Sequence, residues 1–131
     1  MGVQMISESK AILVLDDDAS ILRSTKNVLL KAGYAVDTAE TGKEALEKMQ
    51  TKNYDVVLLD VRLPDMDGTE VLLQMKNAGD TIKIIITGFS SDELGMRAAD
   101  YGADDFLVKP IRPEELLATI RERLTTVQPK S

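Results

Sequence analysis

Short apolar runs alternate with amphipathic stretches along this 131-residue chain. The runs that have the length of β-strands span residues 11–15, 34–38, 54–59, 82–87 and 104–108. Between them, apolar residues recur at the spacing of one face of an α-helix. Strands that alternate with helices predict βαβ units, and hence a parallel sheet that is covered by helices on both faces.

Each expected helix begins at a residue that suits a helix N-terminus. The first helix should end near Gly33, since glycine is the preferred residue just past a helix end. The second follows a capping box, Thr41–Glu44, ahead of an apolar set. The fifth has a proline in its first turn and one apolar face. The expected starts are Asp18, Thr41, Asp67, Ser90 and Pro113, and the inward face of the fifth helix is Leu116, Leu117, Ile120 and Leu124.

The runs differ in how uniformly apolar they are, and this difference predicts their order in the sheet. Residues 11–15, 54–59 and 82–87 are the most uniformly apolar, as strands in the middle of a parallel sheet should be. Residues 34–38 and 104–108 are more mixed and suit the two edges. The expected fold class is α/β, a doubly wound (βα)5 flavodoxin-like three-layer sandwich with a five-stranded parallel sheet in the order 2-1-3-4-5.

Four of the runs lead into polar side chains of specific kinds. Because the carboxyl ends of parallel strands meet at one edge of the sheet, these side chains should gather there, where open α/β sheets place their sites. Carboxylates, a hydroxyl and an ammonium in one crevice indicate metal-assisted phosphoryl chemistry. In chain order the polar groups are the triplet Asp16–Asp18, then Asp60, Thr87 and Lys109.

The acidic triplet has two explanations. Aspartate after a strand is a common turn residue and N-cap, so one of Asp16, Asp17 and Asp18 is expected to cap the next helix. Three in a row exceed that need, and neighbouring carboxylates repel each other unless a cation compensates. Mg²⁺ takes oxygen ligands and is usually held by one or two carboxylates. From the triplet alone, both capping and metal binding remain open.

Asp60 and Lys109 also have structural and chemical explanations. Asp60 stands between an apolar run and a loop marked by Pro64 and Gly68, so a strand-ending turn would account for it. Beside a divalent cation, however, its carboxylate can attack phosphorus and form an aspartyl phosphate. The Lys109 ammonium could bridge to Asp60 or to a phosphoryl oxygen. Thr87 alone is weak evidence, because threonine is common in strands.

The composition narrows the possible function classes. A formal net charge of -6 and a pI near 4.7 argue against non-specific nucleic-acid binding. The chain has no cysteine and no histidine, which excludes thiol and Ser-His catalysis, cysteine-based zinc sites and a role as phosphohistidine donor. Neither a signal peptide nor a run of roughly 20 apolar residues is present, so a cytoplasmic protein is expected.

Four motifs carry the chemistry: ILVLDDD at residues 12–18, VVLLDVRLPDMDG at 56–68, IIITG at 84–88 and GADDFLVKP at 102–110. Together they resemble the receiver domain of two-component response regulators, of the chemotaxis-regulator type. The resemblance covers about residues 10–125. It implies one receiver domain over that range, with polar tails at residues 1–9 and 126–131.

The resemblance implies a role for each residue at the strand ends. Asp60 would be the phosphoacceptor. Mg²⁺ would be the cofactor, with Asp17 as a direct ligand and Asp16 acting largely through water. The implied metal set is Asp16, Asp17, Asp60 and the backbone carbonyl of Arg62, the implied catalytic set is Asp60, Thr87 and Lys109, and the implied switch residues are Thr87 and Phe106.

The resemblance implies a signalling switch rather than an enzyme. Asp60 would take a phosphoryl group from a sensor histidine kinase or phosphotransfer protein, with Mg²⁺-dependent self-phosphorylation and slow self-dephosphorylation. Thr87 and Phe106 would then repack the face of the fourth helix, fifth strand and fifth helix, and so signal to a downstream partner or output domain. No direct binding of nucleic acid or membrane is expected. Apolar Phe89, at the mouth of the site, has two open explanations: it restricts attacking water, or it is part of a surface that faces a partner.

Three rival functions are less consistent with the residues. A phosphatase of the haloacid dehalogenase type usually has a second aspartate two positions after the nucleophile, where this chain has Arg62, and it needs room for a cap domain. A flavodoxin-like cofactor binder should show a phosphate-cradling loop, and no GxGxxG pattern occurs among the eight glycines. A degenerate receiver that binds a partner constitutively would not be expected to retain the whole set of polar residues.

Overall fold

The computed structural model describes residues 9–61, 63–75, 80–88 and 102–126. The strands are β1 (Ala11–Leu15), β2 (Ala35–Ala39), β3 (Val56–Asp60), β4 (Ile82–Thr87) and β5 (Asp105–Val108). The helices of the described residues are α1 (Ala19–Lys31), α2 (Gly42–Thr51), α3 (Gly68–Gln74) and α5 (Pro113–Thr126). The helix predicted to begin at Ser90 lies outside these residues.

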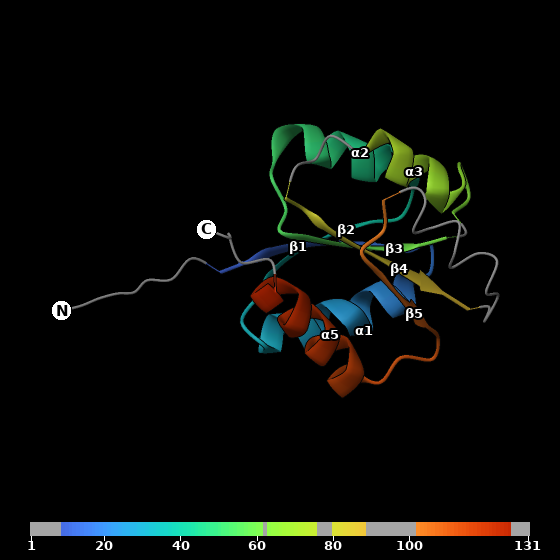
Figure 1. Cartoon of the computed structure of the whole chain (residues 1–131). Coiled ribbons are helices and arrows are strands. Elements are labelled where there is room, and N and C mark those ends of the chain that lie inside the picture. The colour runs from blue at the N-terminus through green and yellow to red at the C-terminus, as the bar shows by residue number, and fades with distance from the viewer. Residues whose placement is uncertain (1–8, 62, 76–79, 89–101, 127–131) are drawn as a thin grey trace.

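The strands form one parallel sheet in the order β2-β1-β3-β4-β5 (Figure 1). This confirms the predicted α/β fold and strand order, including the two edge strands. The third strand begins later than predicted, at Val56 instead of residue 54. Just before it, the main chain of Asp55 bonds to Ala11 and Ile82, but the amide of Ala11 donates to the Asp55 carboxylate and not to a main-chain carbonyl.

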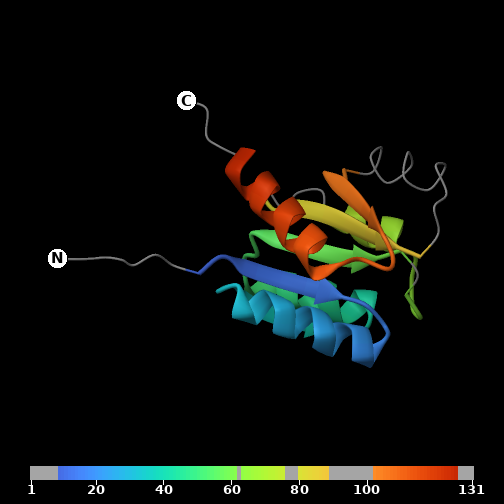
Figure 2. The same ribbon diagram turned by 90° about the horizontal axis from the view of Figure 1, so that it is seen from below.

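Among the described residues, two helices cover each face of the sheet. In Figure 1, α2 and α3 lie on one side of the strands and α1 and α5 on the other, and Figure 2 views the molecule from the α1 and α5 side. Side chains of a strand point alternately to the two faces, so Leu13 and Leu15 enter the core beneath α2 and α3, whereas Ile12 and Val14 enter the core beneath α1 and α5. The central strands β3 and β4 are buried along their whole length, which explains their uniformly apolar sequences.

Within the described residues, the helix starts expected from the sequence are confirmed, whereas the start expected at Ser90 is not tested. Asp18, Thr41 and Asp67 are the N-caps of α1, α2 and α3, and each side chain accepts a backbone amide of the helix that it precedes. Gly33 follows α1 with a φ of 98°, a left-handed conformation that glycine adopts without strain. Pro113 is the first residue of α5. The predicted inward face of α5 packs on the core as expected, through Leu116, Leu117, Ile120 and Leu124.

Residues 1–8 and 127–131, which make up most of the predicted polar tails, lie outside the described residues. In the described part of the chain, no helix combines the length and the apolar character that a membrane crossing would require.

Candidate active site

The carboxyl ends of β1 and β3 bring three acidic side chains together. The two strands are neighbours, and Leu15 pairs with Leu59, so the residues that follow each of them lie at the same edge. Asp16, Asp17 and Asp60 each offer a carboxylate oxygen, and these oxygens lie within 4.8 Å of one another. Asp16 and Asp60 are buried, whereas Asp17 is exposed.

Within the acidic triplet, the capping role belongs to Asp18. Its carboxylate accepts the amides of Ser20 at 2.9 Å and Ile21 at 3.2 Å. Asp16 uses Oδ1 to accept the amide of Asp18 at 3.0 Å, which fixes the turn between β1 and α1. Helix capping therefore accounts for Asp18, but it does not account for Asp17 or for the second oxygen of Asp16.

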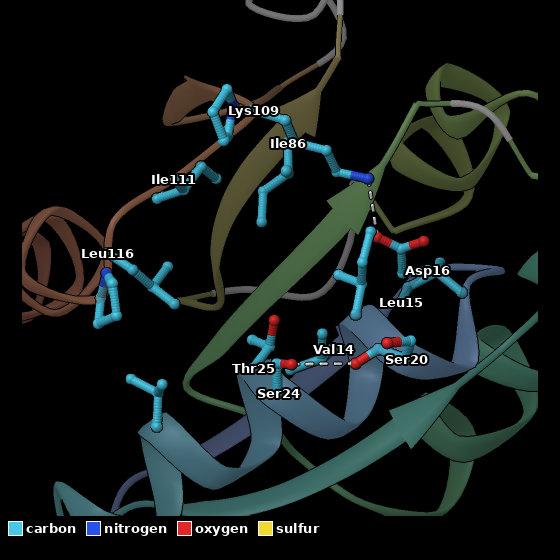
Figure 3. A pocket seen from close by; sticks show the side chains of 14 residues that line it. Val14, Leu15, Asp16, Ser20, Ser24, Thr25, Ile86, Lys109, Ile111 and Leu116 are labelled. Carbon is cyan, nitrogen blue, oxygen red and sulfur yellow. Dashed lines mark hydrogen bonds and ion pairs between the residues drawn. The ribbon is translucent and has the colours of Figure 1, made fainter.

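Lys109 joins two of the three carboxylates. It follows β5, and its Nζ lies 3.0 Å from Asp16 Oδ2 and 3.0 Å from Asp60 Oδ2. Figure 3 shows the ammonium beside Asp16. The Lys109–Pro110 peptide bond is cis. The sequence predicted a bridge from Lys109 to Asp60 or to a phosphoryl oxygen. The structure contains the bridge to Asp60 and a second one to Asp16.

The ionisation of this cluster reflects burial and pairing. Burial raises the pKa of the Asp16 carboxyl, and hydrogen bonds from the Asp18 amide and from Lys109 offset only part of that effect. Burial acts to lower the pKa of Lys109, but its bonds to Asp60 and Asp16 outweigh burial, and its pKa lies above the ordinary value. Lys109 is therefore held in its charged form between carboxylates that repel each other.

Thr87 lies at the same edge as the acidic cluster. It ends β4 directly after Ile86, which pairs with Asp60, and its side chain is buried. The Thr87 carbonyl accepts the amide of Lys109 at 2.7 Å, so the strand register holds Thr87 beside Lys109. Phe106 lies on the edge strand β5 and is 42% exposed. A large ring in such an outward position has apolar surface that it could bury by moving inward.

The loop after Asp60 folds back onto its own start. The amide of Gly68 donates to the Val61 carbonyl at 2.7 Å. A Cβ on Gly68 would lie 2.8 Å from the Asp60 carbonyl oxygen and 2.8 Å from Val61 Cα, so only glycine fits here. Two predicted residues of the site, Arg62 and Phe89, lie outside the described residues.

A cavity of about 540 Å³ lies beside the site, between α1 and α5 (Figure 3). Asp16 and Lys109 form part of its lining, and most of the rest is apolar, including Ile21, Val28 and Leu116. The sequence did not predict this cavity, because it depends on how the side chains of two helices meet. The sequence also did not predict the contact of Asp65, in the loop after Asp60, with the start of α2.

The residues at this edge fit a magnesium ion. Mg²⁺ prefers hard oxygen ligands and keeps several of its waters, and it is usually held by one or two carboxylates. Asp16, Asp17 and Asp60 present carboxylate oxygens close enough to share one ion. Asp17 is exposed to solvent, which suits an ion that stays partly hydrated. The repulsion among the carboxylates also favours a cation beyond the single ammonium of Lys109.

Known proteins resemble this chain in both sequence and structure. A family model described as the response regulator receiver domain matches residues 12–121. The response regulator MprA of Mycolicibacterium vanbaalenii is 41% identical over 120 residues, which are 90% of this chain and 52% of that protein. MprA of Mycobacterium bovis is 40% identical over 124 residues, 93% of this chain and 54% of that protein. The chain spans about half the length of these relatives.

Solved structures agree with the sequence relatives. A CheY-like response regulator receiver domain protein from Methanospirillum hungatei has a TM-score of 0.88 and 40% identity, over 92% of this chain and 97% of that one. The chemotaxis response regulator CheY4 of Vibrio cholerae has a TM-score of 0.82 and 35% identity, over 88% of this chain and 99% of that one. With the fold and the acidic edge already established, these matches show that the chain belongs to the response regulator receiver domain family of two-component systems.

Proposed function

We propose that this receiver domain accepts a phosphoryl group on Asp60 from a phosphohistidine of a sensor histidine kinase or phosphotransfer protein. The observation that carries the proposal is the position of the buried Asp60 carboxylate, 3.0 Å from the Lys109 ammonium and beside the carboxylates of Asp16 and Asp17. In-line phosphoryl transfer requires mainly that the nucleophile be positioned and that charge on the phosphoryl oxygens be neutralised.

Asp60 is the nucleophile in this step. One of its carboxylate oxygens forms a bond to phosphorus while the bond between phosphorus and the donor imidazole nitrogen breaks. The imidazole leaves with the electron pair of that bond and takes up a proton. The chain contains no histidine, which is consistent with its receiving the group rather than donating it in the same way.

Lys109 and Thr87 bind the transferred group. The ammonium of Lys109 is already charged and already beside Asp60, so it can donate to a phosphoryl oxygen without a large rearrangement. Thr87 ends the neighbouring strand and donates its hydroxyl to another oxygen. Mg²⁺, held by Asp16, Asp17, Asp60 and the backbone carbonyl of Arg62, supplies further positive charge against the phosphoryl oxygens when it is bound.

The phosphorylated domain then changes its surface. The new group carries roughly -1.5 to -2 charges and three acceptor oxygens. Thr87 turns towards these oxygens, and the space that it leaves is available to the Phe106 ring, which is 42% exposed beforehand. Phe106 has no hydroxyl, so its two positions differ only in packing. The movement alters the face made by the predicted fourth helix, β5 and α5, which is read by a downstream partner or output domain.

The remaining properties follow from the same role. The domain extends over about residues 10–125 and acts in the cytoplasm as a switch. It phosphorylates itself from small phosphodonors when Mg²⁺ is present and slowly loses the group again. It makes no direct contact with nucleic acid, in keeping with its net charge of -6.

Intact-mass spectrometry after incubation with acetyl phosphate tests the proposal. The wild-type protein should gain one phosphoryl group with Mg²⁺ and none when the metal is chelated, and Asp60→Asn should gain none. Asp55→Asn is the matched control, because Asp55 is a partly buried carboxylate at the other end of the same strand. It should be phosphorylated like the wild type. A phosphoryl gain in Asp60→Asn equal to that of the wild type would rule the proposal out.

A further inference from the structure

Asp65 ties the loop that follows Asp60 to a helix from a different part of the chain. Its Oδ1 accepts the amide of Gly42 at 2.9 Å, and its Oδ2 accepts the amide of Lys43 at 3.0 Å. These are the first two residues of α2. The amides of Gly42 and Lys43 hold the pKa of Asp65 below its usual range, so the carboxylate stays charged at neutral pH.

The two bonds that Asp65 accepts from α2 take over part of the role of an N-cap residue. A helix begins with amides that have no partner inside the helix, and a side chain just before it usually satisfies one of them. Here the side-chain hydroxyl of Thr41, the residue before α2, accepts the amide of Glu44 at 3.1 Å. The two preceding amides are satisfied by Asp65, more than 20 residues away. The start of α2 and the loop after Asp60 are therefore fixed to each other.

Side-chain packing also holds the loop after Asp60 against the start of α2. A Cβ at position 42 would lie 2.6 Å from Met66 Cγ and 2.7 Å from its Sδ, so Met66 lies directly over the glycine that begins α2. At the far end of the loop, the Gly68 amide bonds to the Val61 carbonyl. The loop is thus held at Gly68, at Met66 and at Asp65. Of these three contacts, only the one made by Asp65 depends on a charged side chain.

We propose that Asp65 is a positioning residue for the magnesium and phosphoryl site. By clamping the loop against α2, it fixes the described main chain that follows Asp60, at Val61 and at residues 63–68. Asp65 does not touch the reacting groups. It acts through the main chain between itself and Asp60, and the inference rests on the proposed function of that site.

The expected effect is a loss of metal affinity that exceeds any loss of stability. Removing a partner that orients a metal ligand typically weakens metal binding about tenfold or more. Asp65→Ala should therefore weaken Mg²⁺ binding about tenfold. Asp65→Asn keeps one acceptor oxygen but turns an amide donor towards a second N–H donor, so it should be nearly as weak. Asp65→Glu keeps both oxygens and should recover most of the affinity.

Two control variants separate positioning from simpler explanations. Thr41→Ala removes a cap from the same helix without touching the loop, so it reports what loss of α2 capping alone does. Asp67→Asn removes a negative charge from the same loop but keeps an N-cap acceptor for α3, so it reports the effect of charge alone. A loss of Mg²⁺ affinity that is caused by the missing charge becomes smaller at high salt, whereas a loss that is caused by a displaced ligand remains.

Two measurements decide the question, both at a temperature where circular dichroism shows each variant folded. In metal-free protein, hydrogen exchange of the Gly68 amide should be faster in Asp65→Ala than in wild type, Thr41→Ala and Asp67→Asn. By isothermal titration calorimetry with Mg²⁺ alone, Asp65→Ala should bind about tenfold more weakly than those three proteins.

The outcomes separate this inference from the proposal on which it rests. If Asp65→Ala binds Mg²⁺ no more weakly than Thr41→Ala or Asp67→Asn, the positioning role is refuted while the proposed function stands. The same conclusion follows if Asp65→Glu fails to recover affinity. If the wild-type protein neither binds Mg²⁺ nor gains a phosphoryl group from acetyl phosphate, both the inference and the proposed function are refuted.

Discussion

The two ends of the sheet contain the same type of side chain in very different surroundings. At the amino end, Asp55 and Asp104 stand just before β3 and β5. Asp55 accepts the amide of Ala11 at 2.8 Å, and Asp104 accepts the amide of Lys83 at 2.8 Å. Each carboxylate thus satisfies an amide near the start of the neighbouring strand, β1 or β4. These acidic residues complete the hydrogen bonding of the sheet.

At the carboxyl end of the sheet, acidic side chains surround the ammonium group of Lys109. Asp16 and Asp60 share the ammonium of Lys109, and Asp17 adds a third carboxylate within 4.8 Å. Burial raises the pKa of Asp16 in spite of its bond to Lys109. The comparison shows that a carboxylate bonded to a backbone amide serves the fold, whereas carboxylates crowded beside one another retain the capacity to bind a cation or to react.

The largest expected effect comes from removing the Lys109 ammonium at the carboxyl end of the sheet. Lys109→Met should slow phosphorylation by acetyl phosphate about 100-fold, because one fixed donor to the phosphoryl oxygens is lost. Mg²⁺ affinity should stay equal or rise, because the ammonium no longer competes for Asp16 and Asp60. Rates come from intact mass over time and affinities from calorimetry. Lys52→Met, which removes a surface lysine paired with Asp37, is the control. A phosphorylation rate equal to that of wild type would show that Lys109 has no part in the transfer.

A second prediction compares the Mg²⁺ affinity of variants at the carboxyl end and at the amino end of the sheet. Asp17→Asn should weaken Mg²⁺ binding by about tenfold or more, because a proposed direct ligand is neutralised. Asp104→Asn, at the amino end, removes the same charge and should leave Mg²⁺ affinity unchanged. Calorimetric titration with Mg²⁺ measures both. Equal losses in the two variants would mean that the general charge of the protein, and not a site, attracts the ion.

A third variant tests the amino end of the sheet, where the carboxylates complete the hydrogen bonding of the strands. Asp55→Ala removes the acceptor of the Ala11 amide and should lower the free energy of unfolding by about 1 kcal/mol. Mg²⁺ affinity and phosphorylation should be unchanged, since the side chain lies at the opposite end of β3. Urea unfolding followed by circular dichroism gives the stability. A loss of phosphorylation in a folded Asp55→Ala protein would contradict the separation of the two ends.

The smallest expected effect concerns pH. Tyr54 donates to Asp37 at 2.7 Å, and this bond lowers the pKa of Asp37. A carboxyl group with a lowered folded-state pKa stabilises the fold above its unfolded value of about 3.9, and that contribution disappears as the pH falls through the folded-state pKa. The difference in unfolding free energy between wild type and Tyr54→Phe should therefore shrink below about pH 4. A difference that stays constant from neutral to acid pH would show that the bond does not act through Asp37 ionisation.

The sequence predicted the fold and the gathering of the polar groups because both depend on local pattern. Apolar runs of strand length define the sheet, and the polar residue after each run must lie at one edge once the strands are parallel. Asp16, Asp60, Thr87 and Lys109 meet at that edge for this reason. The caps at Asp18, Thr41 and Asp67 were predictable in the same way, since each acts within a few residues.

Other features depend on contacts between distant segments, which no local spacing encodes. The reach of Asp65 to α2 requires the exact path of the loop after Asp60, and in the sequence Asp65 looks like an ordinary turn residue between Pro64 and Gly68. The bonds from the Ala11 amide to Asp55 and from the Lys83 amide to Asp104 are contacts of the same kind. The cavity between α1 and α5 reflects the shapes of side chains that meet across two helices.

The position of the phosphoryl group is the most direct test of the account. Borohydride reduces an aspartyl phosphate to homoserine, so treatment with acetyl phosphate and Mg²⁺ followed by borohydride marks the modified residue. Peptide mapping by mass spectrometry then identifies that residue. We expect homoserine at position 60, dependent on Mg²⁺ and absent from untreated protein. Homoserine at position 16, 17 or 55 in place of position 60 would contradict it.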